Sequence, residues 1–363
     1  MSNLQLAYNL IDNLASGSKL TFEEFMLLLE AYQSDRGNEV SRYARNKAAG
    51  IRDSIYGRNV YVRGLIEISN ICKNDCLYCG IRKSNSHCDR YRLTKDEILE
   101  RVHYGYNLGI RTIVMQSGED AYYTDEVLVD IISSIKEKYD VAVTLSLGER
   151  EDESYQRLYE AGADRYLLRH ETADEEHYSK LHPDNMSWSH RMNCLNSLRR
   201  IGYQVGCGFM VGSPYQNNMN LARDLVFIQK FQPDMCGIGP FIPHKDTPFA
   251  CEKAGSVELT CFLLVLIRLI CPNVLLPATT ALATLSSDGR IKGLLSGANV
   301  IMPNLSPEVV RSKYTLYDNK ANTGLESLDA LDSIKSDLEI NGFVLSLDKG
   351  DRVGFDRKKI RGD

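Results

Sequence analysis

The sequence alternates short apolar segments with amphipathic helical segments, and this alternation limits the folds that the chain can adopt. From residue 60 onward the pattern returns about every 30 residues, which is typical of strand–helix units with parallel strands. Strands are predicted at 60–68, 112–116, 142–147, 165–169, 204–211, 235–239, 275–279 and 298–303. Helices are predicted between them at 94–108, 125–138, 188–201, 220–231, 258–270 and 282–296. Such a series predicts an α/β protein with a (β/α)8 TIM barrel.

An open, doubly wound sheet is the alternative arrangement of these repeats. Its nucleotide-binding forms carry a GxGxxG turn after the first strand, and none is present here. We expect residues 1–57 to form an N-terminal helical extension and residues 58–317 to form the barrel. Residues 318–363 are predicted to be a tail that packs on the barrel, with a helix at 327–341 and a short strand at 343–347.

The composition excludes several classes of protein. The chain of 363 residues is 43% hydrophobic and 25% charged, which is ordinary for a globular protein. Its net charge of -5 gives no electrostatic footprint for nucleic acid or an anionic membrane. The most apolar stretch, 259–271, is too short to cross a membrane, and the N-terminus does not resemble a secretory signal. We therefore expect a cytoplasmic protein with reduced cysteines and no nucleic-acid or membrane partner.

Cys72, Cys76 and Cys79 follow the first predicted strand in CxxxCxxC spacing. Iron–sulfur clusters are usually held by four protein thiolates, so a group of three predicts a 4Fe-4S cluster with one iron left for a non-protein ligand. A structural zinc site is the competing interpretation. It needs a fourth ligand, and the nearby His87 and Cys88 do not stand in a paired zinc-binding spacing.

Polar residues also follow most of the predicted strands. A (β/α)8 barrel has its active site at the carboxyl ends of its strands, so these residues are candidates for a site. Arg169 and Glu171 stand out, because a charge on an interior strand is costly unless it is paired or binds a ligand. They predict either a structural ion pair or part of the site.

The cysteine motif, with Tyr78 before its last cysteine, resembles the signature of the radical S-adenosylmethionine enzymes. The resemblance implies that S-adenosylmethionine completes the open iron and is cleaved to methionine and a 5'-deoxyadenosyl radical. It implies contacts to the amino group from 117–119, to the carboxylate from Arg191 and to the adenine from 238–240. The full implied set is Tyr78, Gln116, Ser117, Gly118, Glu119, Glu171, Arg191, Ile238, Gly239 and Pro240.

Longer motifs resemble the biotin-synthase-like branch of these enzymes, and within it the HydE family of FeFe-hydrogenase maturases. The matching segments are 116–123, 144–149, 166–172, 237–244, 277–281 and 298–304. The resemblance implies a small-molecule or organometallic substrate, a cysteine-bound iron carbonyl cyanide fragment attacked at sulfur. It also implies an electron donor such as ferredoxin or flavodoxin, and other hydrogenase maturases as partners. The implied substrate cavity is lined by Thr144, Arg169, Thr279, Thr280, Met302, Tyr314 and Tyr317.

The sequence departs from that family in one respect. Some members hold a second cluster with cysteines that follow the tyrosine pair, whereas residues 316–336 contain no cysteine, so we expect a single cluster. The other cysteines are expected to be buried apolar residues. They are Cys88, Cys194, Cys207, Cys236, Cys251, Cys261 and Cys271.

Two other functions are compatible with these residues. A methylornithine synthase or another biotin-synthase-like radical enzyme would share the barrel and the S-adenosylmethionine contacts, although Thr279, Thr280 and Met302 favour the maturase. A non-catalytic iron–sulfur electron carrier or scaffold would need four protein ligands. A response of the cluster to S-adenosylmethionine separates the enzymes from the carrier.

Overall fold

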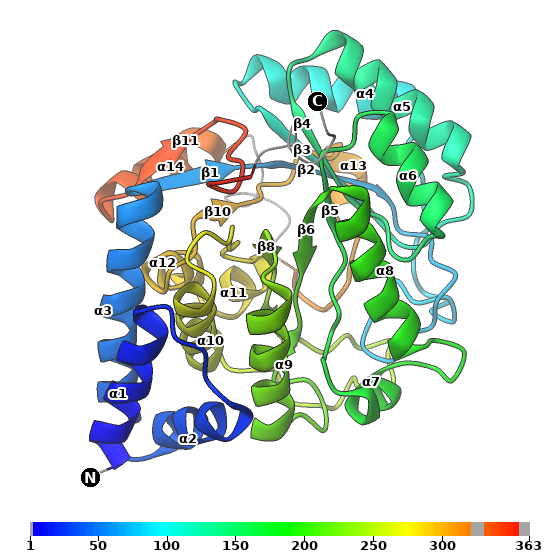
Figure 1. The fold of residues 1–363 in the computed structure, drawn as a ribbon. Coiled ribbons are helices and arrows are strands. Elements are labelled where there is room, and N and C mark those ends of the chain that lie inside the picture. Colours follow the sequence, from blue (N-terminus) through cyan, green and yellow to red (C-terminus); the bar gives the residue numbers. More distant parts are fainter. Residues whose placement is uncertain (1–2, 321–329, 356–363) are drawn as a thin grey trace.

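Parallel strands form a ring in the computed structural model, which describes residues 3–320 and 330–355 (Figure 1). Most of the ring is one six-stranded parallel sheet in the order β2-β3-β4-β5-β6-β8. Its strands are β2 (Gly64–Ser69), β3 (Thr112–Ser117), β4 (Ala142–Ser146), β5 (Arg165–Leu167), β6 (Gln204–Cys207) and β8 (Met235–Cys236). The register pairs Glu67 with Gln116 and Gln116 with Ser146, so polar residues of neighbouring strands lie side by side near the carboxyl ends.

Short contacts close the ring between β8 and β2. Met235 bridges Leu275, and Pro277 bridges Val300 of β10 (Val300–Ile301). Strand β10 pairs in parallel with β1 (Asn59–Val62), which leads directly into β2. The (β/α)8 fold class is thereby confirmed, although the predicted strand at 275–279 is reduced to isolated bridges.

Two of the predicted strands are interrupted. Residues 60–68 divide into β1 and β2, and residues 204–211 divide into β6 and β7 (Met210–Val211). Strand β7 leaves the main sheet and pairs with β9 (Gly239–Pro240), which continues the β8 segment. The break after β6 lies at Gly208, where φ is +155° and an added Cβ would lie 2.0 Å from the Gly237 carbonyl oxygen.

Helices cover the outside of the ring. They are α4 (Lys95–Asn107), α5 (Asp125–Lys138), α6 (Asp152–Glu160), α7 (Glu175–Leu181), α8 (Trp188–Ile201), α9 (Asn218–Phe231), α10 (Val257–Ile270), α11 (Thr280–Leu285), α12 (Gly289–Leu295) and α13 (Glu308–Arg311). The helix predicted at 282–296 is wrong as a continuous element, because a turn at 286–288 separates α11 from α12. Gly289 fits this turn, since an added Cβ would lie 2.0 Å from the Leu282 carbonyl oxygen.

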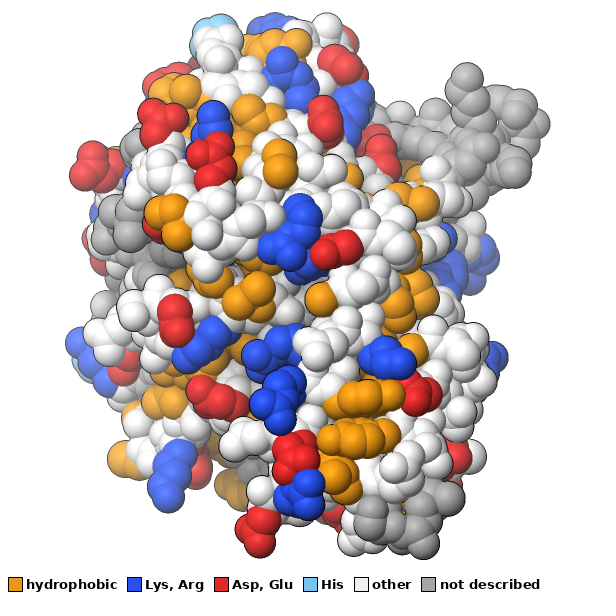
Figure 2. All heavy atoms as spheres, turned by 90° about the vertical axis from the view of Figure 1, so that its left-hand side faces the viewer, with side chains coloured by type: hydrophobic (Ala, Val, Ile, Leu, Met, Phe, Trp, Pro, Cys, Tyr) orange, Lys and Arg blue, Asp and Glu red, His pale blue; other side chains and the backbone are white. Residues whose placement is uncertain are grey.

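The N-terminal helices α1 (Asn3–Ala15), α2 (Phe22–Gln33) and α3 (Gly37–Tyr56) stand at one side of the barrel (Figure 1). Helix α2 begins at a cap, because Thr21 and Glu24 form a reciprocal capping box. Helix α3 packs on α10 and α2 packs on α9. Lysine, arginine, aspartate and glutamate side chains are interspersed with hydrophobic ones over the face in Figure 2.

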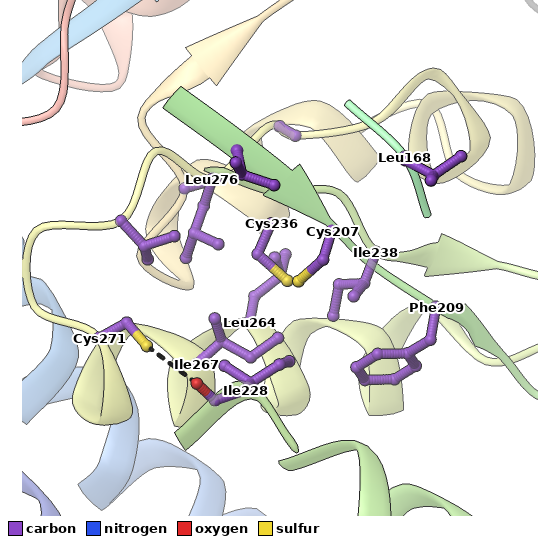
Figure 3. Packing of buried hydrophobic residues seen from close by; sticks show 14 of the residues in the cluster. Leu168, Cys207, Phe209, Ile228, Cys236, Ile238, Leu264, Ile267, Cys271 and Leu276 are labelled. Carbon is purple, nitrogen blue, oxygen red and sulfur yellow. Dashed lines mark hydrogen bonds between the residues drawn. The ribbon is translucent and has the colours of Figure 1, made fainter. Parts of the chain in front are cut away.

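The hydrophobic core lies between the sheet and its helices. Figure 3 shows Cys207 of β6 and Cys236 of β8 facing each other across the register of the two strands, among aliphatic side chains. The sulfur of Cys271 lies 3.8 Å from the Ile228 carbonyl oxygen. Besides these three, Cys194 and Cys261 are buried as predicted. The prediction is wrong for Cys251, which is exposed, and Cys88 is only partly buried.

The described C-terminal residues run along the rim of the barrel that is formed by the amino ends of its strands. Helix α14 (Leu331–Ile340) corresponds to the predicted helix, of which residues 327–329 lie outside the described residues. Strand β11 (Val344–Ser346) pairs in parallel with β1. The following residues then reach the amino ends of β3, β5 and β6, where the Lys349 carbonyl oxygen accepts hydrogen bonds from Thr112 and Arg165. The division of the chain into an extension (1–57), a barrel (58–317) and a tail (318–363) stays a prediction.

Within the described ranges, no helix is both long and apolar enough to cross a membrane. The most apolar helix, α10, has 14 residues and is buried between α3, α9 and the barrel. Its Arg268 is fully buried and donates to the carbonyl oxygens of Gly297 and Pro272. Its apolar character therefore reflects packing inside the protein.

Candidate active site

The three motif cysteines lie in the loop that follows β2, at the carboxyl ends of the barrel strands. The sulfur of Cys72 accepts backbone N–H bonds from Asn74 at 3.5 Å and from Glu119 at 3.4 Å, which favour a thiolate. Asp75 holds the loop together, because its carboxylate accepts from Arg82 Nε at 2.8 Å. The Arg82 guanidinium lowers the pKa of Asp75 to about 2, so this pair persists at neutral pH.

The three thiols influence one another. Burial raises the pKa of Cys79 to about 12, and the neighbouring Cys72 adds to this increase. Burial also raises the pKa of Cys76, with Cys79 and Cys72 as the next causes. Thiols in such a group are protonated unless a metal binds and stabilises the thiolates. This donor set fits three corners of a 4Fe-4S cluster.

Among residues 3–320 and 330–355, no three His, Cys, Asp or Glu side chains are grouped closely enough to hold a single metal ion. The ligands of a four-iron cluster each bind a different iron, so they are spread more widely than those of one ion.

Gly118 allows the loop after β3 to approach the cysteine loop. An added Cβ would lie 2.4 Å from the Ile71 carbonyl oxygen and 2.8 Å from the Cys72 Cβ. Only glycine, which has no Cβ, avoids these clashes. The Gly118 N–H donates to the Ser69 carbonyl oxygen at 3.2 Å, and the Lys73 N–H donates to the Glu119 carbonyl oxygen at 2.9 Å. The predicted segment 117–119 therefore borders the cysteine loop directly.

The carboxylate of Glu119 lies between the cysteine loop and the end of β4. Its Oε1 accepts from the Glu149 N–H at 3.0 Å, and its Oε2 is 3.1 Å from Lys73 Nζ. Gly148, with φ of +77°, leaves room for this side chain, because an added Cβ would lie 2.1 Å from Glu119 Cγ. The predicted amino-group acceptor is thus an oriented carboxylate at the edge of the site.

Arg169, Glu171 and Arg191 come together beyond β5. Arg169 Nη2 is 3.2 Å from Glu171 Oε2, so these two residues form an ion pair. An ion pair was one of the two arrangements that the sequence predicted for them. Glu171 is buried at a φ of +64°, a left-handed backbone conformation that is uncommon for glutamate and concentrates at functional sites. Arg191 Nη1 donates to the Arg169 carbonyl oxygen at 2.7 Å, and its Nε donates to Glu149.

Helix α8 positions Arg191 in its first turn. Ser187 caps this helix by accepting from the His190 N–H at 3.2 Å, and Gly202 ends it in the left-handed region. Arg191 is only 6% exposed, so it is not an ordinary surface arginine. Burial disfavours the charged form of its guanidinium, but the Glu149 carboxylate to which it donates favours that form.

Several buried polar atoms, three of them on predicted cavity residues, have no hydrogen-bond partner among the described residues. Buried polar groups are normally satisfied, so a set of orphaned ones indicates where a bound molecule belongs. They include Thr144 Oγ1, Arg169 Nε, Thr279 Oγ1 and the Tyr178 hydroxyl. A ligand with carboxylate, amine and hydroxyl groups, such as S-adenosylmethionine, fits this set.

The other predicted S-adenosylmethionine contacts fall in two places. Gly239 and Pro240 form β9, and an added Cβ on Gly239 would lie 2.8 Å from Thr279 Oγ1, so this strand borders the predicted cavity. The Ile238 side chain, by contrast, is buried in the hydrophobic core near Phe209 (Figure 3), so only its backbone is available to a ligand. Ser117 bonds its own loop, because its hydroxyl donates to the Gly118 carbonyl oxygen.

The predicted cavity residues do not all lie in one place. Gln116 Nε2 donates to the Tyr314 hydroxyl at 3.3 Å, which joins a predicted S-adenosylmethionine contact to a predicted cavity residue. Thr280 and Met302 instead share the wall of a small pocket that also includes Ile334 of α14. Tyr317 is half-buried in the segment that covers the cysteine loop.

This covering segment, residues 313–320, is named the strap here. Its Leu316 carbonyl oxygen accepts from the Gly80 N–H at 2.8 Å, and its Asp318 N–H donates to the Pro243 carbonyl oxygen at 3.1 Å. Lys320 reaches into the barrel and pairs with Glu67, which is fully buried. The strap therefore joins the cysteine loop, the loop after β9 and the barrel interior.

Sequence reasoning missed several residues of the site. Glu67 carried a signal, since it is a carboxylate in the apolar run 60–68. Its partner Lys320 carried none. Asn304, which donates to Glu67 at 2.9 Å, is the last residue of the matching segment 298–304. His182 also carried no signal, and it bonds the motif tyrosine from a different part of the chain.

The comparisons with known proteins agree with this geometry. Residues 66–228 match the Radical SAM superfamily. The [FeFe] hydrogenase maturase subunit HydE of Thermotoga maritima is 48% identical over 305 residues, which cover 83% of this chain and 86% of that protein. Methylornithine synthase (PylB) has a TM-score of 0.77 at 25% identity, covering 93% of this chain and 97% of that one. The maturase HydG from Carboxydothermus hydrogenoformans has a TM-score of 0.75 at 20% identity, covering 94% of this chain and 80% of that one, which supports the fold alone.

The barrel and its cysteine loop define the class of protein as a radical S-adenosylmethionine enzyme. The chain belongs to the HydE family of [FeFe] hydrogenase maturase subunits within that superfamily. A 4Fe-4S cluster and S-adenosylmethionine are the cofactors of this class.

Proposed function

We propose that this protein cleaves S-adenosylmethionine at a single 4Fe-4S cluster and acts in the assembly of the FeFe-hydrogenase active-site subcluster. The observation that carries the proposal is the cysteine loop at the carboxyl end of β2, within a chain 48% identical to a HydE over most of its length. When bound, the cluster and S-adenosylmethionine supply a reactive 5'-deoxyadenosyl radical.

Different residues would bind the cluster and S-adenosylmethionine. Cys72, Cys76 and Cys79 would hold three irons and leave the fourth to the ligand. The Glu119 carboxylate would accept from the amino group, and Arg191 would pair with the carboxylate. These roles agree with the orientation of both side chains, because Glu149 holds each of them. Its backbone N–H donates to the Glu119 carboxylate, and its own carboxylate accepts from Arg191.

The substrate would lie deeper in the barrel than S-adenosylmethionine. A carbon radical abstracts hydrogen from almost any nearby group, so the site has to exclude water and hold its target close. Arg169 offers a positive charge to an anionic substrate, and the hydroxyls of Thr144 and Thr279 offer further hydrogen bonds. We propose a cysteine-bound iron carbonyl cyanide fragment as the substrate, on the basis of the family.

The proposal extends to the partners of the protein. The reaction needs one electron for each cleavage, which a ferredoxin or flavodoxin would supply, and the product would pass to other hydrogenase maturases. We also propose a cytoplasmic location.

The first experiment tests S-adenosylmethionine cleavage. Anaerobically reconstituted protein reduced with dithionite should release methionine and 5'-deoxyadenosine, and S-adenosylmethionine should change the electron paramagnetic resonance spectrum of the reduced cluster. The Cys76→Ala variant should lose both the cluster and the cleavage, because two thiolates do not hold it. The Cys251→Ala variant is the matched control, since this cysteine is exposed on the surface. Cleavage retained by Cys76→Ala would contradict the ligand assignment.

A second experiment tests the maturase function. Addition of the protein to an extract that lacks only its HydE activity should restore hydrogen production by an FeFe-hydrogenase. The maturase assignment would be contradicted if the purified protein converted lysine to methylornithine and did not restore the hydrogenase. That result would favour the methylornithine synthase alternative.

A further inference from the structure

Three consecutive residues of the cysteine loop contact residues 181–186, the end of α7 and the segment after it, about a hundred residues further along the chain. The Leu77 N–H donates to the Leu181 carbonyl oxygen at 3.0 Å. The Tyr78 hydroxyl lies 3.1 Å from His182 Nε2. The sulfur of Cys76 is 3.7 Å from the sulfur of Met186. This segment is therefore the support on which the end of the cysteine loop rests.

The hydrogen bonds of His182 fix its tautomer. Its Nδ1 is 2.9 Å from the Tyr178 carbonyl oxygen, which can only accept, so Nδ1 carries the proton. In the neutral ring Nε2 is then an acceptor, and the Tyr78 hydroxyl donates to it. Burial lowers the pKa of His182 to about 3, so the ring is neutral at the pH of a cell and this acceptor persists.

Packing holds the imidazole in place on both sides. The Tyr178 ring stacks on it with 3.8 Å between the ring centroids and 21° between the planes. The Tyr78 ring meets it edge-on, at 5.4 Å and 89°. His182 is only 2% exposed, so it cannot turn away to bond water. A hydroxyl bonded to such a fixed acceptor keeps its own ring in one orientation.

The Tyr78 ring lies at the candidate site. Tyr78 stands between Cys76 and Cys79 in the cysteine loop, and its side chain packs with Leu181, Met210 and Phe241, which lie at the end of α7, in β7 and directly after β9. We propose that His182 is a positioning residue, which orients the Tyr78 ring for S-adenosylmethionine by accepting its hydroxyl hydrogen bond. This inference rests on the proposed function, and it adds a residue that touches neither the cluster nor the ligand.

A double-mutant cycle tests the proposal by measuring the dissociation constant of S-adenosylmethionine for the reconstituted protein. The variants are Tyr78→Phe, His182→Phe and the two combined, and iron content is measured for each. Loss of one buried hydrogen bond should weaken binding roughly five- to tenfold in either single variant. The double variant should be no weaker than the singles, because both remove the same bond. His182→Gln, whose side-chain oxygen can accept, should restore part of the affinity.

Tyr203→Phe is the matched control. Its buried hydroxyl likewise donates one hydrogen bond, to the Tyr155 carbonyl oxygen at 2.8 Å, but it lies directly before β6, away from the carboxyl ends of the strands. We expect it to bind S-adenosylmethionine as the wild type does. Additive losses in the cycle, or unchanged affinity in Tyr78→Phe with full iron content, would overturn the proposal. If His182→Phe fails to fold, Tyr78→Phe decides alone, since it removes a single oxygen atom. A wild-type protein that does not bind S-adenosylmethionine contradicts the proposed function instead.

Discussion

At the scale of the residue, Gly118 sets how closely two loops of the site can approach. Its Cα faces the Ile71 carbonyl group and the Cys72 side chain, which leave no room for a Cβ. The requirement comes from the fold, because Gly118 and Cys72 follow different strands. A glycine at this position is therefore part of the cluster site, although it supplies no ligand.

We predict that Gly118→Ala loses most of its cluster and destabilises the protein by about 1–3 kcal/mol, because the cysteine loop has to shift away from the added methyl group. Iron content and chemical unfolding of the purified variant measure the two effects. Gly50→Ala is the control, since Gly50 lies in α3 with no atom within 4 Å of an added Cβ. It should be neutral or slightly stabilising. A full cluster in Gly118→Ala would contradict the prediction.

His182 makes a second prediction at this scale, on the pH dependence of stability. Burial lowers its pKa to about 3, whereas an unfolded chain has a histidine pKa of about 6.5. Between these values the unfolded chain binds a proton that the folded chain does not, so the free energy of unfolding falls as the pH decreases. The slope from this residue is at most about 1.4 kcal/mol per pH unit. It is absent above about pH 6.5.

The comparison of wild type with His182→Gln isolates this contribution. Urea unfolding of the cluster-free proteins between pH 7 and pH 4.5 should show a weaker decline for the variant. Parallel curves for the two proteins would mean that His182 takes up a proton in the folded state.

At the scale of the element, the strap is held by a buried ion pair. Lys320 has a side chain 7% exposed and Glu67 is fully buried, and Lys320 also donates to the Tyr314 carbonyl oxygen at 3.1 Å. Removing one partner of such a pair leaves a charge without compensation, which is more costly than removing both.

We predict that Lys320→Met destabilises the protein by about 3–5 kcal/mol and that the double variant Glu67→Gln/Lys320→Met recovers part of this loss. Chemical unfolding gives the free energies. The strap should also become more sensitive to proteolysis in Lys320→Met, because it loses its attachment to the barrel interior. Lys313→Met is the matched control, since Lys313 pairs with Asp89 at the surface at 2.8 Å. Equal losses in the two lysine variants would contradict the role of the buried pair.

At the scale of the whole molecule, the end of the described chain closes the amino-terminal rim of the barrel. Arg165 is fully buried, and its Nη2 donates to Asp351 at 2.7 Å. Gln204 Nε2 donates to the same carboxylate at 2.6 Å, and Arg352 Nε donates to Asp234 at 2.6 Å. The tail thus neutralises charged residues at the start of the strands, at the opposite end from the site.

We predict that Asp351→Asn destabilises the protein by about 1–2 kcal/mol, because Arg165 loses its charged partner while Asp351 itself is half-exposed. Thermal unfolding measures the loss, and S-adenosylmethionine cleavage per cluster should be unchanged. Asp348→Asn is the control, since this exposed residue accepts a hydrogen bond from the neighbouring Ser346. A decrease in cleavage without a decrease in stability would show that the two rims are coupled.

The sequence by itself determined the features that depend on local spacing. The strand and helix repeats, the α2 capping box and the cysteine loop after the first strand are all readable from short windows, because hydrophobic periodicity and ligand spacing are properties of neighbouring residues. The motifs likewise led to the family. Even here the boundaries were approximate, as the reduced strand at 275–279 and the split helix at 282–296 demonstrate.

Only the tertiary structure decided which distant polar groups meet. Glu67 and Lys320 are 253 residues apart, Arg165 and Asp351 are 186 apart, and Tyr78 and His182 are 104 apart. No periodic pattern connects such residues, because their contact depends on how the ring closes and where the strap and tail cross it. Each pair is nevertheless specific, since a polar group that the closed barrel removes from water has to find a partner within it.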